Sequence, residues 1–376
     1  MEFNIKNDYF NKAISEVSKS VSTRTTLPIL TGIKIIADTD GLTLIGSNSD
    51  IIIERILPKS NDGENMLEVL KTGSVVISAK YLSEIIKKLP NDIYLKVNDN
   101  QSVVIQSEEI VTKLNGINGE EYPSLPKVNL SSNFKIKSDD LIDIIKQTVF
   151  AASKSESKPI LTGVNFSFQE ELLTCVATNS HRLALKKYNI KSNLNGSFIV
   201  PSSSLIEFSR LFGSCTTEID IYATETNIVF KSNTISLYSR LIEGVYPNIS
   251  ALIPEQSNTI ITLDTTQLLK GIDRASLFAS EWRNNNINLQ IIDKSRLKIS
   301  SKSSEMGQIE EVQYIKGISG VDELDISLDG NFMMDALKAI KEDEVKLCFN
   351  GSMRPILVIP EGNEQQLQLI SPVRSY

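Results

Sequence analysis

The chain has 376 residues, of which 41% are hydrophobic and 23% are charged, a composition typical of a globular protein with several hydrophobic cores. Its formal net charge is −7 at pH 7. This acidic balance argues against a protein that holds nucleic acid by bulk charge attraction, but it leaves open a protein that encloses DNA.

Neither the N-terminus nor any apolar run indicates export or membrane insertion. Met1-Glu2-Phe3-Asn4 lacks the basic start and the apolar core of a signal peptide, and the longest apolar runs span only several residues. We therefore expect a cytoplasmic protein with no membrane partner.

The cysteines Cys175, Cys215 and Cys348 are far apart and form no C-x-x-C pair. This spacing suggests neither a disulfide framework nor a zinc site, so each is expected to be a small core residue. A single histidine adds no usual metal-ligand spacing, and neither glycine-rich nucleotide-binding motif occurs. We expect no metal and no cofactor.

The first third of the chain predicts two helices and a series of strands. The first helix has an apolar face made of Phe10, Ala13, Ile14, Val17 and Val21. A second helical pattern covers residues 78–89, after a strand-like lead-in at residues 75–77. Alternating apolar residues between turn-forming clusters predict strands at residues 33–37, 42–46, 51–57, 93–97, 103–106 and 110–114.

A phrase from the first third returns in the second. Residues 28–35 read Pro-Ile-Leu-Thr-Gly-Ile-Lys-Ile, and residues 159–166 read Pro-Ile-Leu-Thr-Gly-Val-Asn-Phe, an offset of 159 − 28 = 131. Such an identity indicates an internal repeat, each copy opening a strand-like run. The second third also repeats the two helical patterns, near residue 138 and at residues 201–212, and predicts strands at residues 164–168, 172–178, 182–190, 217–223, 227–231 and 235–241.

The last third is a weaker third copy. Residues 263–268 resemble the start of the second copy at residue 136, an offset of 263 − 136 = 127, and a second helical pattern follows at residues 328–340. Asn7, Ser138 and Thr265 open the first helix of each copy and are expected to be its N-cap. Strands are predicted at residues 287–292, 296–301, 307–314, 344–349, 356–359 and 366–370.

Three units, each with two helices against many strands, predict an α+β fold in which an antiparallel sheet carries its helices on one face. Such units in one chain leave unpaired sheet edges at the two ends, which favours a closed homo-oligomer.

The residues that invite an enzymatic interpretation are Ser180, His181 and Arg182. A Ser/His hydrolase is one hypothesis, but the G-x-S-x-G turn that usually carries such a serine is absent. The alternative is a partly buried imidazole near the start of a strand. The lack of catalytic signatures in a chain of this length favours a binding protein.

Cations recur near the predicted helices. Singly they are typical of solvated faces, but helices on one face of a closed ring would direct them toward a common axis. They are Arg24, Lys80, Lys87, Lys88, Lys146, Lys154, Lys158 and Arg210.

Over its full length the sequence resembles the bacterial sliding clamps, the beta subunits of DNA polymerase III holoenzyme. The resemblance rests on residues 24–30 (Arg-Thr-Thr-Leu-Pro-Ile-Leu), 121–123 (Glu-Tyr-Pro), 177–184 (Ala-Thr-Asn-Ser-His-Arg-Leu-Ala), 351–355 (Gly-Ser-Met-Arg-Pro) and the Pro-x-Arg ending at residues 372–374.

The resemblance implies three clamp-type domains, at residues 1–127, 128–254 and 255–376, that assemble as a head-to-tail homodimeric ring around duplex DNA. It implies a non-catalytic processivity factor for DNA replication. Implied partners are double-stranded DNA without sequence preference, the DNA polymerase III alpha subunit, the clamp loader, and other polymerases and repair proteins that carry clamp-binding peptides.

The resemblance also implies three sets of functional residues. The peptide-binding groove would comprise Leu161, Thr178, Ser180, His181, Arg182, Leu183, Pro247, Leu252, Met353, Pro355, Pro372, Val373 and Arg374. The DNA-facing set would be Arg24, Lys80, Lys87 and Arg210, and the dimer interface would use Leu277, Phe278, Ile110 and Leu114. An accessory or paralogous clamp that serves repair partners is the main alternative.

Overall fold

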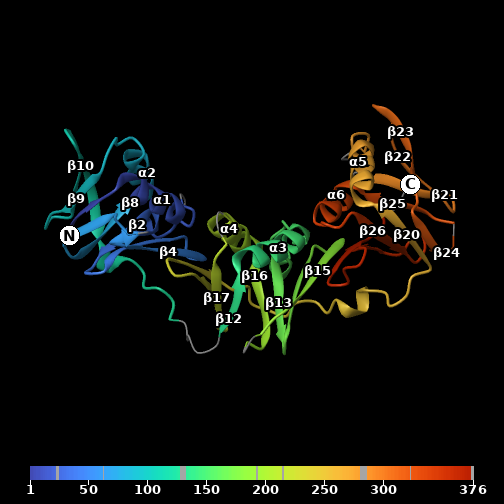
Figure 1. Ribbon diagram of the computed structural model, residues 1–376, viewed down its shortest axis with the longest axis horizontal. Coiled ribbons are helices and arrows are strands. Elements are labelled where there is room, and N and C mark those ends of the chain that lie inside the picture. The colour runs from blue at the N-terminus through green and yellow to red at the C-terminus, as the bar shows by residue number, and fades with distance from the viewer. Residues whose placement is uncertain are drawn as a thin grey trace. The chain divides into compact units, whose positions relative to one another are not determined.

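A computed structural model describes residues 1–22, 25–61, 63–127, 133–191, 194–213, 216–279, 286–321 and 323–373 (Figure 1). Contacts divide the chain into two compact units. Unit 1 comprises Met1–Asp139 with Glu207–Leu241, and unit 2 comprises Asp140–Ile206 with Ile242–Tyr376. The central third of the sequence is therefore shared between the two units.

Unit 1 is built on one long antiparallel sheet. Its strand order is β12 (Asn133–Lys137), β17 (Glu218–Ala223), β18 (Asn227–Lys231), β19 (Ile235–Arg240), β4 (Ile51–Pro58), β3 (Gly41–Ser47), β2 (Gly32–Ala37), β8 (Gly73–Ser78), β11 (Ile110–Asn118), β10 (Ser102–Ser107), β9 (Ile93–Val97), β1 (Glu2–Ile5) and β7 (Leu67–Lys71). A short hairpin joins β5 (Ser60–Asn61) to β6 (Glu64–Asn65).

The pairing of β4 with β19 continues this sheet from the first third of the chain into the central third. Ile53 lies opposite Leu237, and both side chains are fully buried. Buried positions alternate along the first half of β4, and residues directly opposite each other in an antiparallel pair share a face, so Ile53 and Leu237 lie on one face of the sheet.

Two helices cover one face of the first-third strands (Figure 1), α1 (Asn7–Ser18) and α2 (Ala79–Ile86). Phe10, Ala13, Ile14 and Val17 of α1 are fully buried, as the 3.6-residue period predicts. The backbone of α1 comes close to β3, where a Cβ on Gly46 would lie 2.6 Å from the carbonyl oxygen of Val17. Only glycine permits this approach.

Unit 2 contains two antiparallel sheets. The larger has the order β16 (Gly196–Pro201), β13 (Gly163–Gln169), β14 (Leu172–Thr178), β15 (Arg182–Asn189), β28 (Gln366–Ile370), β27 (Ile356–Pro360), β26 (Glu344–Phe349), β20 (Thr259–Asp264) and β24 (Gly317–Gly320). The smaller has the order β23 (Gly307–Tyr314), β22 (Arg296–Ser303), β21 (Asn286–Asp293) and β25 (Asp325–Asp329).

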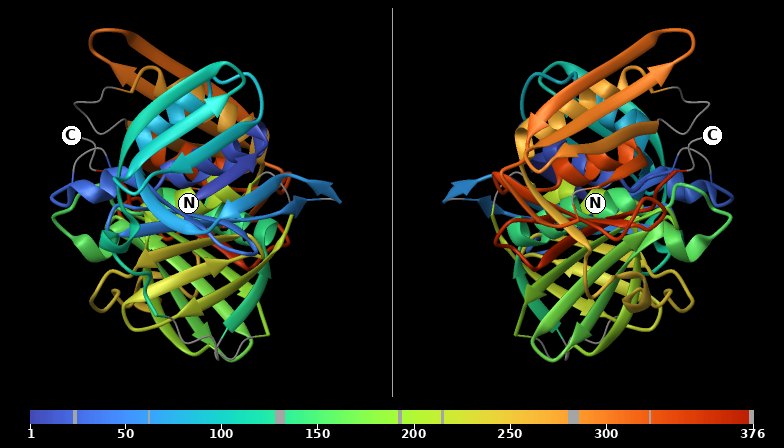
Figure 2. Two further views of the ribbon diagram at one scale, coloured as in Figure 1. Left: turned by 90° about the vertical axis from the view of Figure 1, so that its left-hand side faces the viewer. Right: turned by 90° about the vertical axis from the view of Figure 1, so that its right-hand side faces the viewer.

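Helices α5 (Thr265–Ser276) and α6 (Gly330–Lys338) share one core with both sheets of unit 2. Leu268, Ile272 and Met333 are fully buried in it. In the side views of Figure 2 the β22–β23 hairpin, drawn in orange, projects as an arm. The helices that begin in one unit and end in the other are α3 (Ser138–Thr148) and α4 (Ser202–Phe212).

The repeated phrase has the same structure in both copies. It forms a 3-10 turn, η1 (Pro28–Thr31) or η4 (Pro159–Thr162), and the strand starts only at the following glycine. The strands predicted at residues 33–37 and 164–168 are confirmed, and in each copy a threonine hydroxyl closes the turn that precedes the strand. Thr31 donates to the carbonyl of Pro28 across 2.8 Å, and Thr162 donates to that of Pro159 across 2.7 Å.

The predicted N-caps were wrong by one residue. Asn7, Ser138 and Thr265 are the first residues inside α1, α3 and α5, and Asp264 caps α5 by accepting from the amide of Gln267. The three predicted caps instead bond to the chain that follows the second helix of the same copy. Asn7 donates to Leu89 O (2.5 Å), Ser138 Oγ accepts from Thr217 N (3.1 Å), and Thr265 Oγ1 donates to Glu342 O (2.8 Å).

Three further expectations differed. Val21 lies beyond the end of α1 and is only half-buried, and α2 and α6 are shorter than their patterns. The sequence reasoning missed short strands that complete the sheets, namely β1, β7, β12, β20 and β24.

Cys175 and Cys348 are buried as expected, whereas Cys215 lies outside the described residues. Among the described helices, none is long and apolar enough to cross a membrane.

Candidate functional site

The turn between β14 and β15 and its flanking residues carry five of the thirteen predicted groove residues. Asn179 Oδ1 accepts from the amides of His181 and Arg182, each across 3.0 Å. Thr178 Oγ1 donates to the carbonyl of Arg182 across 2.6 Å and accepts from the amide of Ser180 across 3.2 Å. Ser180 has a φ of 77°, in the left-handed region that tight turns use. The side-chain bonds therefore fix this turn from within.

The C-terminal strand brings the end of the chain to the same place. β15 pairs with β28, so that Leu183 lies opposite Leu369. The amide of Ser371 donates to the carbonyl of His181 across 2.9 Å, and the amide of Val373 donates to Ser327 O across 2.8 Å. We call the meeting of these segments the strand-end cluster. It comprises Thr178, Ser180, His181, Arg182, Leu183, Ser371, Pro372 and Val373.

A connecting segment, residues 242–257, closes the cluster from one side. Its Tyr246 hydroxyl accepts a hydrogen bond from the amide of Thr178 across 3.0 Å. Burial raises the pKa of Tyr246 to about 12. Tyr246, Ile249 and Ile253 pack on an apolar cluster on the face of the sheet turned away from α5 and α6, made of Val176, Leu183, Leu185, Cys348, Leu357 and Leu369.

The side chain of Arg182 is nearly buried and joins two helical elements of unit 2. Its Nη1 lies 2.7 Å from Asp335 Oδ2 on α6, and its Nη2 donates to the carbonyl of Phe150 in η3 (Val149–Ala151). The guanidinium lies over two rings, 5.3 Å from the centroid of Phe150 and 4.5 Å from that of Phe332. Stacking between two aromatic faces suits the planar guanidinium of arginine.

The other predicted groove residues are exposed to different degrees. Met353 is 62% exposed in the loop before β27, and Leu252 is 53% exposed within the connecting segment. Pro247 is exposed, Pro355 is half-buried, and Leu161 is buried in η4. Arg374 lies outside the described residues.

The imidazole of His181 was expected to be partly buried, and this was wrong. His181 is exposed because it stands at the apex of the β14–β15 turn. The neighbouring Ser180 hydroxyl accepts a hydrogen bond from the Lys158 ammonium across 3.4 Å. The ammonium is a proton donor, whereas a nucleophilic serine needs a base beside it.

Sequence reasoning missed Tyr246, Phe150, Phe332 and Asp335 as contributors to this region. The available signal was the recurrence of Tyr-Pro at residues 122–123 and 246–247. Nothing local in the sequence connects Phe332 or Asp335 to Arg182, because about 150 residues separate them (335 − 182 = 153).

Unit 1 contains the same turn, with the same contact to a strand end, 131 residues earlier. Asn48 Oδ1 accepts from the amides of Asp50 and Ile51, Ser49 has a φ of 82°, and the amide of Arg240 donates to Asp50 O across 2.8 Å. The side chains differ, however. Asp50 and Ile51 stand where unit 2 has His181 and Arg182, so the stacked guanidinium belongs to unit 2 alone among the described copies.

The predicted DNA-facing cations are exposed where the structure describes them. Lys80 lies over the ring of Tyr81 at 5.9 Å, Lys87 follows α2, and Arg210 pairs with Glu207 one turn earlier on α4. Arg24 lies outside the described residues. Each of the six described α-helices carries an exposed cation, which adds Lys12, Lys146, Lys270 and Lys338.

The predicted dimer residues lie on exposed edges of their own units. Leu277 is 70% exposed and Phe278 is half-buried, and both follow the last residue of α5 rather than lying within it. Ile110 is 44% exposed and Leu114 half-buried on β11. In the described residues β11 pairs with β8 only at residues 116–118, so one edge of its first half has no neighbouring strand.

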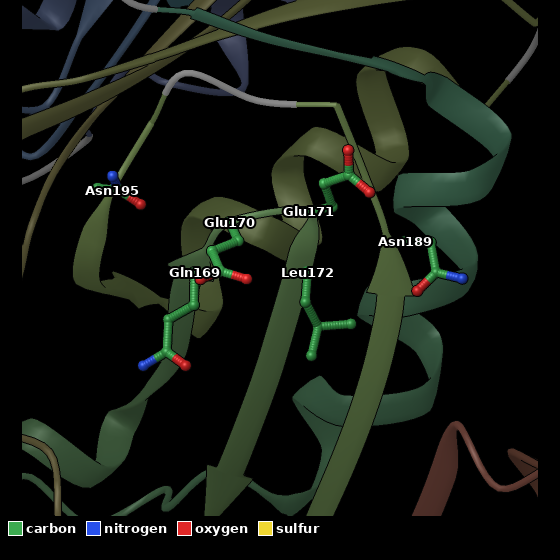
Figure 3. Close-up of a pocket in the computed structure, with 6 residues that line it drawn as sticks. All are labelled: Gln169, Glu170, Glu171, Leu172, Asn189 and Asn195. Atoms are coloured by element: carbon green, nitrogen blue, oxygen red, sulfur yellow. The ribbon is translucent and has the colours of Figure 1, made fainter.

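Figure 3 shows a cavity of about 710 Å³ at the opposite end of β14 and β15 from the strand-end cluster. Gln169, Glu170, Glu171, Leu172, Asn189 and Asn195 line it. With one apolar residue in six, it offers little to an apolar peptide anchor. No group of three potential metal ligands occurs among the described residues.

Comparison with known proteins assigns the whole chain to one family. Models of the DNA polymerase III beta subunit match residues 1–126 (N-terminal domain), 135–248 (central domain) and 250–374 (C-terminal domain). The beta sliding clamps of Bacillus subtilis and Staphylococcus aureus are 41% and 40% identical, with full coverage of both chains.

Solved structures agree. The sliding clamp of Bacillus subtilis superposes with a TM-score of 0.97 at 41% identity. A DNA polymerase III beta chain from Streptococcus pneumoniae superposes with a TM-score of 0.95 at 33% identity, and both matches cover each chain fully. The chain therefore belongs to the DNA polymerase III beta subunit family, the beta sliding clamps, which are non-catalytic processivity subunits.

Proposed function

We propose that two copies of this chain close head to tail into a ring around duplex DNA and tether DNA polymerases through peptides bound at the strand-end cluster. The observation that carries the proposal is the convergence of the β14–β15 turn, the C-terminal residues and the connecting segment at one place. These segments are distant in the sequence. Pro247 and Leu252 are exposed in the connecting segment, whose Tyr246, Ile249 and Ile253 pack on the buried apolar cluster, and Met353 is exposed in the loop before β27.

Apolar anchoring is the expected source of affinity at this site. A buried Leu or Phe side chain of a partner peptide contributes roughly 1.5 to 3 kcal/mol, so two anchors support micromolar binding once the costs of association are subtracted. The unbranched side chain of Met353 can adapt to several partners. The polymerase III alpha subunit, the clamp loader and repair polymerases are the partners we expect.

The proposed ring rests on the exposed edges of the two units. Leu277 and Phe278 lie beyond the end of α5, and the first half of β11 has an open edge with Ile110 and Leu114. An open strand edge is an aggregation hazard unless another chain pairs with it. Head-to-tail closure would cover both surfaces and would place one copy's first domain against the other's third.

The charge distribution of the chain favours a weak contact with DNA. The chain carries a net charge of −7, yet each described helix presents an exposed cation. A closed ring resists dissociation topologically, so a modest cationic lining suffices to meet the phosphates without sequence readout. Tight phosphate binding would hinder sliding.

We further infer three domains, at residues 1–127, 128–254 and 255–376. We also infer that the protein acts on DNA in the cytoplasm. A paralogous clamp dedicated to repair partners would share these features, and affinity for replicative against repair polymerase peptides distinguishes the two. A Ser180/His181 hydrolase is disfavoured by the proton donor at Ser180.

Retention on circular DNA tests the ring. The full-length protein is loaded onto nicked circular DNA by a clamp loader with ATP and then separated from free protein by gel filtration. We expect it to stay with the circle and to leave once a restriction enzyme linearises the DNA. Equal retention on circular and linear DNA would indicate ordinary binding and contradict enclosure.

A further inference from the structure

A second cavity in unit 2 lies away from the strand-end cluster, on the same face of the larger sheet. Its volume is about 1010 Å³, and the end of the connecting segment, β20, β26, β27, the β27–β28 turn and β28 line it. We call it the connector cavity. Its size is at the upper end of the range for ligand sites.

The floor of the connector cavity is apolar. Ile260, Ile359 and Leu367 are half-buried in it, above the buried Cys348 and Leu357. These residues alternate along their strands with the residues that face α5 and α6, so the floor belongs to the outer surface of the sheet. Partly exposed Ile and Leu side chains at the floor are available to an apolar group.

The rim of the connector cavity is acidic. Glu255 is exposed in the connecting segment, Glu364 is exposed in the β27–β28 turn, and Glu361 of the same turn is half-buried. The one lysine among the lining residues, Lys346, pairs with Glu361 across 2.8 Å. The lining therefore carries more carboxylates than cations, which favours a positively charged occupant and disfavours nucleic acid or an anionic lipid surface.

The walls of the cavity are fixed by hydrogen bonds. Asn350 Nδ2 donates to Gln256 O across 3.0 Å, and Asn350 Oδ1 accepts from Asn258 N across 2.9 Å, which holds the connecting segment at the end of β26. In the β27–β28 turn the Asn363 side chain donates to Glu342 Oε1 across 2.6 Å. A preformed cavity loses little entropy when it binds a ligand.

We propose that the connector cavity is a second docking site, which takes a short cationic peptide segment with one or two large apolar side chains. The apolar side chains would lie on Ile260, Ile359 and Leu367, and flanking lysines or arginines would meet Glu255 and Glu364. The site goes beyond the proposed peptide groove, since it shares none of the predicted groove residues. A partner with two such segments would gain affinity through multivalency.

The cavity of Figure 3 provides a matched comparison within unit 2. Its two glutamates, Glu170 and Glu171, give it the same net charge as the connector cavity, where Lys346 offsets one of three glutamates, but the rest of its lining is mostly polar. Acidic charge alone would make both cavities attract a cationic peptide equally. An apolar floor under the acidic rim is what distinguishes the connector cavity.

The test is fluorescence anisotropy of a labelled peptide, Lys-Lys-Leu-Phe-Lys-Lys, titrated with the full-length protein, next to its counterpart with glutamates in place of the lysines. We expect Glu255→Lys with Glu364→Lys to weaken binding of the lysine peptide by about tenfold, and Ile359→Ser to weaken it as well, whereas the glutamate peptide should bind the unaltered protein at least about tenfold more weakly than the lysine peptide does. The control Glu170→Lys with Glu171→Lys makes the same change in net charge and should leave the affinity within about twofold. Thermal unfolding of each variant checks its fold.

Deletion of residues 372–376 separates this site from the proposed groove. We expect the truncated protein to retain binding of the lysine peptide, and methyl resonances of Ile260 and Ile359 to shift on its addition. Equal loss in the Glu255/Glu364 and Glu170/Glu171 variants would reduce the effect to general charge attraction. Loss of lysine-peptide binding in the truncated protein would place the peptide at the strand-end cluster. Either result overturns the proposal of a second site but leaves the proposed groove intact.

Discussion

The backbone amide of Thr178 donates a hydrogen bond to the hydroxyl of Tyr246 across 3.0 Å, and this bond ties the end of β14 to the connecting segment. In unit 1 the hydroxyl of Tyr122 faces the backbone of Ser47, the residue 131 positions before Thr178. The sequence repeat thus extends to a buried tyrosine that anchors each connection between repeats.

These tyrosines predict sensitivity to alkali. Burial raises the pKa of Tyr122 and Tyr246 to about 12, above the ordinary 10, so the unfolded chain loses these protons first. Their contribution to stability is complete below about pH 10 and is lost as the pH rises toward 12. We expect urea midpoints to fall between pH 9.5 and about 11.5. Tyr246→Phe should flatten this dependence and Tyr81→Phe, at an exposed position, should not; equal slopes in all three proteins would contradict the assignment.

Arg182 should contribute to the stability of unit 2 through its two ring contacts and its pair with Asp335. Arg182→Ala is expected to lower the free energy of unfolding by about 2 kcal/mol, a value reduced for the partial exposure of Asp335. Arg182→Lys should recover only part, since an ammonium does not stack as a planar guanidinium does. Chemical denaturation measures both. Arg296→Ala, which removes an exposed arginine paired with the partly exposed Asp293, is the control and should cost under about 0.5 kcal/mol.

The proposed groove requires the end of the chain. Deletion of residues 372–376 removes Pro372 and Val373, whose segment is held by the bond between Val373 N and Ser327 O. We expect polymerase-derived Leu/Phe peptides to bind about tenfold more weakly or worse, because part of the apolar wall is lost. Fluorescence titration against full-length and truncated protein measures this, and sedimentation should show an unchanged dimer. Equal peptide affinities of the full-length and truncated proteins would contradict the groove assignment.

The proposed dimer boundary is tested by placing charge in it. Leu277→Asp combined with Phe278→Asp should separate the subunits, since closing the interface would bury unpaired carboxylates. Analytical ultracentrifugation reports the association state. Val245→Asp with Leu27→Asp alters two exposed apolar residues elsewhere and should leave the dimer intact. If the first double variant sediments as a tight dimer, the boundary lies on another surface.

The proposed lining is tested by reversing its charge. Arg24→Glu, Lys80→Glu and Lys87→Glu together should slow loading onto DNA and reduce the dependence of DNA contact on salt, with fold and dimer unchanged. Loading onto nicked circular DNA is followed across a range of salt concentrations. The control Lys187→Glu, Lys302→Glu changes exposed lysines on strands β15 and β22. If loading is the same at every salt concentration, these residues do not face the DNA.

The sequence by itself determined the local elements and the family. Periods of two and 3.6 residues located most strands and helices, because they record which side of each element is buried. The repeated Pro-Ile-Leu-Thr-Gly phrase revealed the duplication, since a fixed 3-10 turn followed by a tightly packed glycine demands the same residues twice. Asn179 and Asn48 lie between predicted strands, and in the structure each bonds within its own turn.

Only the tertiary structure decided how these elements meet. Nothing local tells β4 to pair with β19 or β15 with β28, since pairing between sheet edges depends on side chains nearly 190 residues apart in the chain (370 − 182 = 188). The same holds for Arg182, whose environment comes from Phe150, Phe332 and Asp335. Helix caps were misplaced for a related reason: Asn7, Ser138 and Thr265 bond across to a distant segment, and such long-range bonds leave no periodic trace in the sequence.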